Sequence, residues 1–283
     1  MKKLPKIIVV CGPTATGKSD KAVSLALEQN GEIISADSRQ IYKGLDIGSG
    51  KITKKEMKGV PHYMLDVASP LRTYSVAQFQ KQASTCIRDI LKRGKTPIIC
   101  GGTGFYIDAL VHETSFPAVK ANTPLRKKLE KENVTDLFTL LKKKDPRRAK
   151  EIDKNNKARI IRALEIVAAL GAVPKAVKKT PYSVKWVYLD FPDDILKDRI
   201  HTRLLKRIKQ GMVAEAKKLH AQGLSLTRME RLGLEYRYLA LLLQNKITRK
   251  EFLEQLENEI WHYAKRQRTW FKKHIPKSYL LER

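Results

Sequence analysis

The sequence predicts an α/β protein with a doubly wound parallel sheet, a helical insertion and a helical C-terminal region. Short apolar runs alternate with helical patterns over the first 113 residues, as in sheets whose parallel strands are joined by helices. A glycine-rich motif lies between the first apolar run and the first helical pattern. A basic helical stretch then separates this region from a later strand-like run. These three observations carry the predicted fold class.

The alternation can be followed along the first part of the chain. Apolar runs predict strands at residues 6–10, 32–36 and 96–100. Helical patterns cover residues 18–29 and 75–93, and a loop-rich stretch fills the interval before the second helix. Each predicted strand is thus separated from the next by a helix or a long connection, which favours parallel pairing.

Two boundaries divide the chain into three predicted parts. Residues 1–113 form the first part of the α/β core, residues 114–181 the basic helical insertion, and residues 182–283 the returning strand with the C-terminal helices. Asp145-Pro146 predicts a turn between helices of the insertion, and Gly171 with Pro174 ends its last helix. The run YSVKWVYLDF after Pro181 is rich in β-branched and aromatic residues and predicts a strand.

The motif GPTATGKS matches the P-loop pattern over residues 12–19, and its strand-to-helix context makes it specific. The fold class is therefore P-loop NTPase-like. In such a loop, backbone N–H groups converge on phosphate oxygens, Lys18 supplies a positive charge, and the Ser19 hydroxyl can bind Mg²⁺. We expect all eight residues to contact a phosphate group: Gly12, Pro13, Thr14, Ala15, Thr16, Gly17, Lys18 and Ser19.

The loop does not by itself indicate phosphoryl transfer. An ATPase usually has an apolar strand ending in Asp that holds Mg²⁺, whereas TPIIC runs into GGTGFY. Asp37, after the strand 32–36, is the one carboxylate that we expect at such a strand end. It can serve as a general base over the carboxyl edge of the sheet or as a cap for the following turn. The turn 101–104 likewise suits either close approach to a ligand or tight packing.

Charge indicates a polyanionic partner. The sequence has 57 Lys and Arg against 29 Asp and Glu, a net charge of +28. Residues 120–180 alone carry 18 Lys or Arg and seven Asp or Glu, a local net charge of +11. Nucleic acid is the leading candidate partner, with a generally Lys-rich composition or an anionic membrane surface as the alternatives.

Cysteine spacing and hydropathy exclude other classes of protein. Cys11, Cys86 and Cys100 show no metal-ligand spacing, so we expect reduced thiols. The apolar stretch near the N-terminus is too short for a signal peptide or membrane span, and we expect a cytoplasmic protein without a membrane partner.

At this point the motifs resemble a known family. They occur in the order GPTATGKS, DSRQIYKGLDIGSGK (37–51), PHYMLD (61–66), YSVAQF (74–79), GGTGFY (101–106), ARIIRALEI (158–166) and AKRQRTWF (264–271). This set is similar to the tRNA dimethylallyltransferases, also called tRNA isopentenyltransferases, over nearly the whole chain. The sequence contains no Cys₂His₂ finger motif, so it resembles the compact bacterial form.

The resemblance implies that the P-loop holds the diphosphate of dimethylallyl diphosphate. The family transfers the dimethylallyl group to N6 of the adenosine immediately 3′ of the anticodon in tRNAs that read codons beginning with U, and releases diphosphate. Negative charge accumulates on the departing oxygens, and backbone amides, Lys18 and Mg²⁺ stabilise it. The implied partners are therefore the anticodon stem-loop of tRNA and the prenyl diphosphate, with the protein as a monomer.

Individual roles follow from the same resemblance. It implies catalytic roles for Asp37 as general base, Lys18, Thr103 and Arg126, the last two near the target base and the diphosphate. The residues that it implies for tRNA contact are Asp37, Ser38, Arg39, Gln40, Thr103, Arg126, Arg159, Arg162, Lys265, Arg266 and Arg268. Arg159 and Arg162 can alternatively belong to a solvated helix face.

Two regions leave alternatives open. In the C-terminal IWHYAKRQRTWFKK, Tyr263 and Trp270 either stack on RNA bases or pack into the core, with the cations alone facing RNA. The segment 230–240 departs from the pattern usual in bacteria, and Ser49 and Gly50 stand where Thr and Ala are commoner.

Three other functions compete with this interpretation. An adenylate isopentenyltransferase shares the loop and Asp37, but a small nucleotide needs few cations. A small-molecule kinase predicts consumption of ATP, and a non-catalytic RNA-binding protein predicts no product. The response to salt distinguishes an adenylate isopentenyltransferase from an enzyme that acts on tRNA, because contacts with a polyanion weaken steeply as the salt concentration rises.

Overall fold

The structure is a computed structural model that describes residues 4–279. It divides into two compact units, one holding the chain up to Glu113 and from Thr180 onward, the other holding Thr114–Lys179. The second unit ends two residues before the boundary expected at residue 181. Each unit has its own hydrophobic core.

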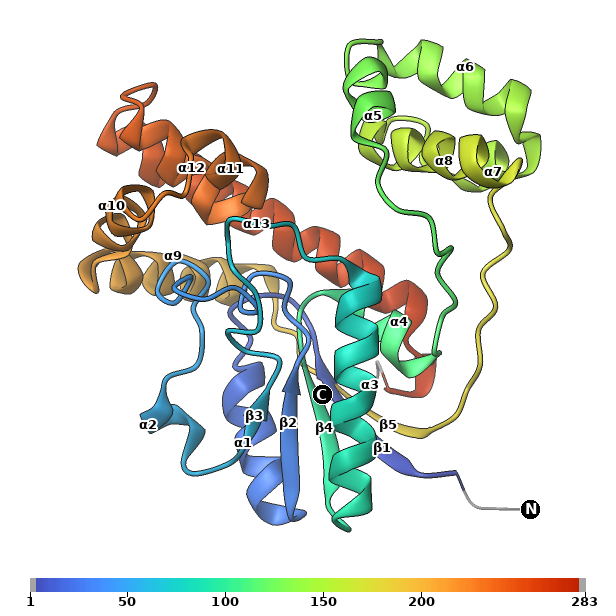
Figure 1. Ribbon diagram of the computed structural model, residues 1–283. Helices are drawn as coiled ribbons and strands as arrows, with labels where there is room; N and C mark the ends of the chain where they lie inside the picture. The colour runs from blue at the N-terminus through green and yellow to red at the C-terminus, as the bar shows by residue number, and fades with distance from the viewer. Residues whose placement is uncertain (1–3, 280–283) are drawn as a thin grey trace. The chain divides into compact units, whose positions relative to one another are not determined.

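A five-stranded parallel sheet forms the centre of the first unit (Figure 1). Its strand order is β3-β2-β4-β1-β5, and the register pairs Ile8 of β1 with Ile98 of β4 and with Lys185 of β5. The strands are β1 (Lys6–Cys11), β2 (Gly31–Ser35), β3 (His62–Tyr63), β4 (Thr96–Gly101) and β5 (Ser183–Tyr188). The two-residue strand β3 was not predicted, because it is too short to show a sequence pattern.

Helices cover both faces of this sheet, which confirms the predicted doubly wound fold. Side chains of β1 alternate between the faces, so Ile8 and Val10 pack with α1 while Ile7 and Val9 face the larger core. The helices of the first part are α1 (Lys18–Glu28), α2 (Lys54–Met57), α3 (Val76–Lys92) and α4 (Gly104–Val111). Those after β5 are α9 (Asp193–Lys209), α10 (Met212–Ala221), α11 (Leu226–Leu232), α12 (Leu234–Leu243) and α13 (Arg249–His274), followed by the short helix η1 (Lys277–Tyr279).

The second unit is entirely helical within residues 114–179. It contains α5 (Thr123–Leu129), α6 (Val134–Lys144), α7 (Pro146–Glu151) and α8 (Lys157–Leu170). Leu137, Leu141 and Ile160 are among the buried residues of its core. Asp145 caps α7 by accepting a hydrogen bond from Arg148 N, and Gly171 ends α8, as the sequence predicts.

None of the helices among the described residues has the length and hydropathy needed to cross a bilayer.

Candidate active site

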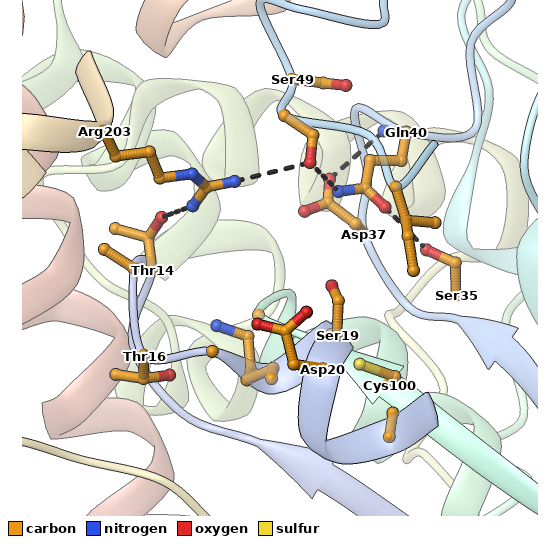
Figure 2. A pocket seen from close by; sticks show the side chains of 18 of the residues that line it. Thr14, Thr16, Ser19, Asp20, Ser35, Asp37, Gln40, Ser49, Cys100 and Arg203 are labelled. Carbon is orange, nitrogen blue, oxygen red and sulfur yellow. Dashed lines mark hydrogen bonds between the residues drawn. The ribbon is translucent and has the colours of Figure 1, made fainter. Parts of the chain in front are cut away.

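A cavity of about 510 Å³ lies at the carboxyl edge of the sheet (Figure 2). Ligands of open α/β folds bind at this edge, because the loops that leave parallel strands converge there. The loops after β1, β2 and β4 and one face of α9 all line the cavity. The sequence-predicted residues among its lining are Thr14 to Ser19, Asp37 and Gln40.

The P-loop joins β1 to α1 in the predicted way. Gly12 and Pro13 are buried. Ala15 has a φ of 64°, in the left-handed region that few residues with a side chain adopt. Thr16 holds the turn together by donating from Oγ1 to the Pro13 carbonyl at 2.9 Å. Strain at a non-glycine residue is typical of a loop shaped to bind a ligand.

Lys18, the first residue of α1, places its ammonium group against this loop. Nζ donates to the Pro13 carbonyl at 2.5 Å. Burial, with a smaller contribution from the Arg203 guanidinium, lowers the pKa of Lys18 to about 8, although Cys100 and Asp37 oppose the shift. An anion that pairs with such a Lys offsets the free-energy cost of burying its charge.

Helix α9 supplies cations that our sequence analysis did not identify. Arg203 donates from Nη1 to Thr14 Oγ1 at 3.2 Å and from Nη2 to the Gly50 carbonyl at 3.4 Å. Arg199 donates from Nε to the Ala15 carbonyl at 2.7 Å, and Lys206 also lines the cavity. Burial, with Arg207 nearby, lowers the pKa of the Arg203 guanidinium. The spacing of residues 199, 203 and 206 on one helix face was the available signal.

Asp37 has the capping role that its sequence allowed, and it also faces the cavity where a general base would act. Its Oδ1 accepts from Arg39 N at 2.8 Å and from Gln40 N at 3.3 Å, which caps the turn after β2. Its other carboxylate oxygen makes no hydrogen bond with a described residue, and Asp37 lines the cavity. One oxygen therefore fixes the side chain and the other is available for chemistry.

Thr103 and Ser38 lie next to Asp37 and bind each other. Ser38 N donates to Thr103 Oγ1 at 3.1 Å, linking the turn after β2 to the turn after β4. Gly101, in the second turn, permits this approach, since a Cβ there would lie 2.3 Å from the Ala36 carbonyl oxygen. Gly101 and Gly102 also line the cavity. The turn 101–104 thus serves tight packing and the cavity wall together.

Helix α13 contributes two further residues to the cavity. Gln267 accepts from Thr14 N at 2.8 Å and donates to the Gly102 carbonyl at 2.8 Å, so it joins the P-loop to the turn after β4. Tyr263 lines the cavity near Thr103, and burial raises the pKa of its phenol, with the Asp37 carboxylate adding to the shift. Gln267 is buried and Tyr263 is half-buried, and both line the cavity.

Trp270, seven residues after Tyr263, has a packing role. It is partly buried against the core, meets Phe271 edge-on at 5.2 Å between ring centroids and stacks on His274 at 4.0 Å. The two aromatic residues that our sequence analysis treated together therefore have different environments.

The cations of α13 also differ from one another. Arg268 is an anchor in the fold: its guanidinium pairs with Asp190 at 2.9 Å and with Asp193 at 2.5 Å. Its side chain is only 16% exposed, so most of it is engaged within the fold. Asp190 lies just beyond β5, so our expectation that Asp37 is the one carboxylate at a strand end was wrong. Lys265 and Arg266 are exposed.

The predicted residues of the helical unit are placed within that unit alone. Arg126 pairs with the buried Glu165 at 2.5 Å, and Arg162 approaches the same carboxylate at 3.5 Å and donates to the Val119 carbonyl. Arg159 is exposed on α8. The arginines at 126 and 162 therefore help to hold their own unit together, whatever else they contact.

The residues at the P-loop fit a Mg²⁺ ion. Ser19 and Asp20, in the first turn of α1, present a hydroxyl and a carboxylate to the cavity (Figure 2). Residues 4–279 contain no group of three or more His, Cys, Asp or Glu side chains arranged around a metal. Mg²⁺ commonly takes one or two protein ligands and completes its shell with substrate phosphates and water, which is the donor set that this cavity offers.

Comparisons with known proteins agree on one family. The family model described as IPP transferase matches residues 40–274. A tRNA dimethylallyltransferase of Anoxybacillus flavithermus is 40% identical over 277 residues, covering 96% of this chain and 88% of the relative. A tRNA dimethylallyltransferase 2 of Treponema denticola is 42% identical, covering 94% and 91%.

Solved structures give the same result. The tRNA isopentenylpyrophosphate transferase of Bacillus halodurans has a TM-score of 0.71 at 37% identity, covering 96% of this chain and 88% of that one. A eukaryotic dimethylallyltransferase acting on tRNA has a TM-score of 0.79 at 26% identity, covering 94% and 70%. With a parallel sheet, a P-loop cavity and these relatives, the chain belongs to the IPP transferase family.

Proposed function

We propose that this protein transfers a dimethylallyl group from dimethylallyl diphosphate to N6 of a tRNA adenosine and releases diphosphate. One observation carries the proposal: Lys18 and Arg203 face the same cavity, and neither forms an ion pair with any described residue. Their hydrogen-bond partners in the structure are uncharged. Two half-buried cations without a carboxylate partner favour an anionic ligand.

A diphosphate leaving group suits this arrangement. As the C–O bond breaks, negative charge gathers on the departing oxygens, and the P-loop amides, Lys18 and Arg203 are placed to stabilise it. Mg²⁺, held by Ser19, would neutralise further charge on the diphosphate when bound. The backbone and side chains are held in place before the reaction, so little reorganisation is needed.

Asp37 is suited to accept the proton of the attacking amine. The N6 lone pair of adenine is delocalised into the ring, so removing a proton as the C–N bond forms assists attack. Asp37 is fixed through Oδ1 and has its other oxygen available at the cavity. We propose the same surroundings, with Ser38, Arg39, Gln40 and Thr103, as the place of the extruded adenosine.

The macromolecular partner is the larger part of the proposal. We propose that the adenosine is the one 3′ of the anticodon in tRNAs reading codons that begin with U, and that Arg126, Arg159, Arg162, Lys265 and Arg266 contact the anticodon stem-loop. Support comes from the net charge of +28 and from the names of the relatives. We further propose that the protein acts as a monomer in the cytoplasm.

The test is to incubate the protein with dimethylallyl diphosphate, Mg²⁺ and unmodified tRNA, and to locate any prenyl adduct by mass spectrometry of digested tRNA. We expect one adduct, on the adenosine beside the anticodon. Modification of AMP but not tRNA would support an adenylate prenyltransferase instead. Transfer of the γ-phosphate of ATP without an adduct would refute the proposal.

A further inference from the structure

The loop 46–50 separates the cavity from helix α10. On its inner side, Ser49 and Gly50 line the cavity. The Gly50 carbonyl accepts from Arg203 Nη2 at 3.4 Å and from Gln40 Nε2 at 3.3 Å. This one backbone oxygen therefore helps to orient two side chains of the site.

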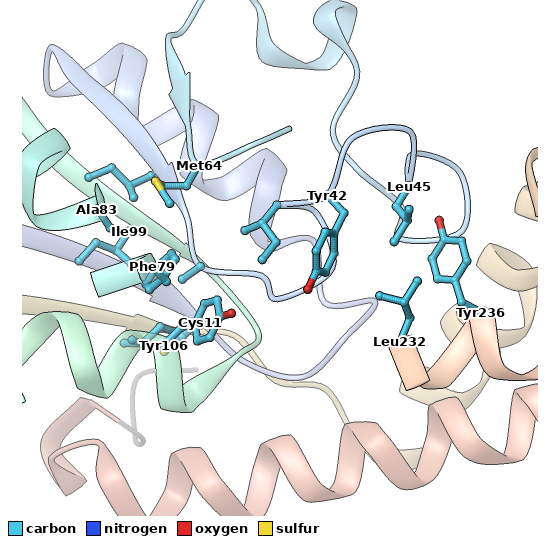
Figure 3. Close-up of a cluster of buried hydrophobic side chains, with 14 of the residues drawn as sticks. Cys11, Tyr42, Leu45, Met64, Phe79, Ala83, Ile99, Tyr106, Leu232 and Tyr236 are labelled. Carbon is cyan, nitrogen blue, oxygen red and sulfur yellow. The ribbon is translucent and has the colours of Figure 1, made fainter. Parts of the chain in front are cut away.

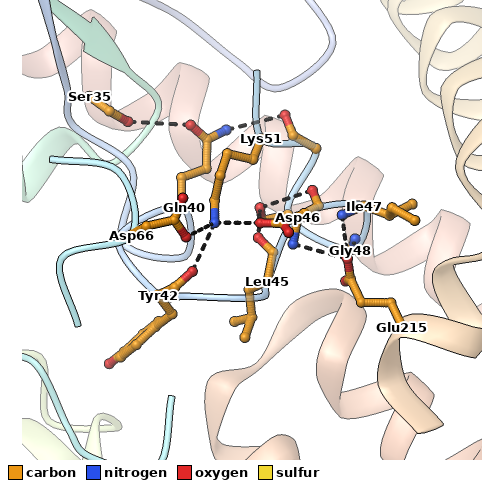
Figure 4. A network of polar contacts seen from close by, with 12 residues as sticks. Ser35, Gln40, Tyr42, Leu45, Asp46, Ile47, Gly48, Lys51, Asp66 and Glu215 are labelled. Atoms are coloured by element: carbon orange, nitrogen blue, oxygen red, sulfur yellow. Dashed lines mark hydrogen bonds and ion pairs between the residues drawn. The ribbon is translucent and has the colours of Figure 1, made fainter. Parts of the chain in front are cut away.

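The outer side of the same loop is held by one carboxylate (Figure 4). Glu215 Oε2 accepts from Asp46 N at 3.0 Å and from Ile47 N at 2.6 Å, and Oε1 accepts from Gly48 N at 2.9 Å. The Tyr236 hydroxyl donates to Oε1 at 2.8 Å and so fixes the carboxylate. Three consecutive amides thus converge on a single side chain of α10.

Charge and close packing make this contact specific. Hydrogen bonds from amides to a carboxylate are stronger than those to a neutral acceptor. Gly48 lets the loop approach Tyr236, because a Cβ at that position would lie 2.5 Å from the Tyr236 hydroxyl oxygen. Residues 46–50 form no helix or strand; Gly50 N binds the Ile47 carbonyl within the loop, whereas the amides of residues 46–48 are satisfied by Glu215.

A second buried residue acts on the same loop from α9. Arg207 donates from Nε to the Ile47 carbonyl at 2.7 Å and pairs with Glu235 at 3.0 Å. At the end of the loop, Lys51 pairs with Asp46 at 2.6 Å and Asp66 at 2.5 Å. The loop is therefore fixed at several points, and Glu215 holds its centre.

We propose that Glu215 is a positioning residue for prenyl transfer: it holds the Gly50 carbonyl in place and thereby orients the Arg203 guanidinium toward the diphosphate. This inference rests on the proposed function, since it assigns the diphosphate to the cavity. Glu215 itself does not line the cavity. The segment 230–240, which departs from the usual bacterial pattern, contributes through Tyr236 and Glu235.

The first experiment is Glu215→Gln in the full-length protein. The amide NH₂ of Gln would face N–H donors where the carboxylate accepts, so the loop should shift. We expect the Kd and KM for dimethylallyl diphosphate to rise about tenfold, a cost typical of a small misplacement of a binding group. The KM for tRNA should stay within about twofold, since the loop acts on the diphosphate side of the site. Unspecific unfolding would instead weaken the affinities for both substrates alike.

Glu230→Gln is the matched control. Glu230 is also a half-buried carboxylate of this helical region, and it accepts from Gln244 Nε2 at 2.6 Å without touching the loop. We expect wild-type constants for it. Should Glu215→Gln fail to fold, Tyr236→Phe removes one hydrogen bond to the same carboxylate and should raise the same constant by a smaller factor.

A double-mutant cycle separates positioning from a merely structural role. If Glu215 acts through Arg203, then Glu215→Gln should have little further effect on prenyl diphosphate affinity in an Arg203→Ala background. Additive effects of the two changes, or an unchanged Kd in Glu215→Gln, would overturn this inference alone. A wild-type protein that does not bind dimethylallyl diphosphate would overturn the proposed function as well.

Discussion

At the scale of single residues, the site combines cations that lack ion-pair partners with one anchored carboxylate. Lys18 and Arg203 bind uncharged oxygens, whereas Asp37 uses one oxygen for the turn and keeps the other at the cavity. This division of roles gives separate predictions for the leaving-group side and the acceptor side of the proposed reaction.

Asp37→Asn tests the acceptor side. Asn keeps an oxygen that can cap the turn after β2, so the local structure should persist. Its amide cannot accept a proton near neutral pH, so the general base is lost. We expect kcat to fall by about 10²- to 10⁴-fold, or about 3 to 5 kcal/mol, the usual contribution of a general base. Affinity for tRNA should change little. Single-turnover prenylation and filter binding measure the two, and near-normal turnover would remove Asp37 from this role.

The pKa of Lys18 predicts how diphosphate binding varies with pH. Because its pKa is lowered to about 8, most of the protein carries a neutral Lys18 above that pH. A bound anion favours the charged form and raises the pKa, so binding near pH 8.5 should take up protons, and affinity should weaken as pH rises through 8. Calorimetry with inorganic diphosphate in buffers of different ionisation enthalpy measures the uptake. Lys18→Met is the control, and equal uptake in both proteins would contradict the assignment.

At the scale of secondary-structure elements, the site depends on helices that pack onto the sheet from the C-terminal part of the chain. Gln267 of α13 holds two loops at once, and Arg268 ties α13 to the segment before α9. The cores under these helices include Phe79 stacked on Tyr106 and the buried Tyr236 (Figure 3). The packing of α13 onto the sheet therefore determines how the P-loop is held in place.

Gln267→Ala tests whether this side chain supports the P-loop. It leaves Thr14 N and the Gly102 carbonyl without their partner, at a cost of about 1 to 3 kcal/mol for each buried group. We expect a lower free energy of unfolding and weaker prenyl diphosphate binding together. Urea denaturation and calorimetry measure these. Gln244→Ala, whose amide bonds Glu230 away from the cavity, should lose stability without losing that affinity.

Glu32 provides a separate prediction for the amino end of β2. Burial alone would raise its pKa, but hydrogen bonds from Lys95, Tyr63 and Arg93 lower it on balance. A lowered folded-state pKa stabilises the protein above the unfolded-state value of about 4.3, and this contribution is lost as pH falls through the folded-state value. Glu32→Gln should cost about 2 kcal/mol at pH 7, allowing for solvent screening of the partly exposed Arg93. The difference from wild type in urea denaturation should shrink toward pH 3.5; a constant difference would argue against the ion pairs.

At the scale of the whole molecule, the net charge of +28 sets the response to salt. A protein that neutralises six to ten phosphates loses about 10³- to 10⁵-fold in affinity between 50 and 200 mM salt. We expect tRNA binding to approach this range and prenyl diphosphate binding to change far less. Replacing Lys142, Lys143 and Lys144 with Gln should reduce the slope for tRNA only. A salt-insensitive tRNA affinity would contradict phosphate contacts by the exposed Lys and Arg side chains.

The sequence alone determined the features that are local in the chain. The P-loop, the longer strands and helices of the core, and the presence of the basic helical insertion follow from motifs and from periodicity over a few turns, because hydrophobic patterning is read from neighbouring residues. The candidate acid–base residue Asp37 also follows, since it stands directly after a predicted strand. Arg268 shows the limit of such inference, because its partners Asp190 and Asp193 lie more than 70 residues away.

Only the tertiary structure decided which distant side chains complete the site. Gln267 and Glu215 look like ordinary positions on amphipathic helices, and no local pattern distinguishes them. Thr14 and Gln267 are 253 residues apart, and they meet because α13 packs across the carboxyl edge of the sheet. Convergence of this kind depends on helix packing summed over the whole core, so it is a property of the folded chain and not of any segment.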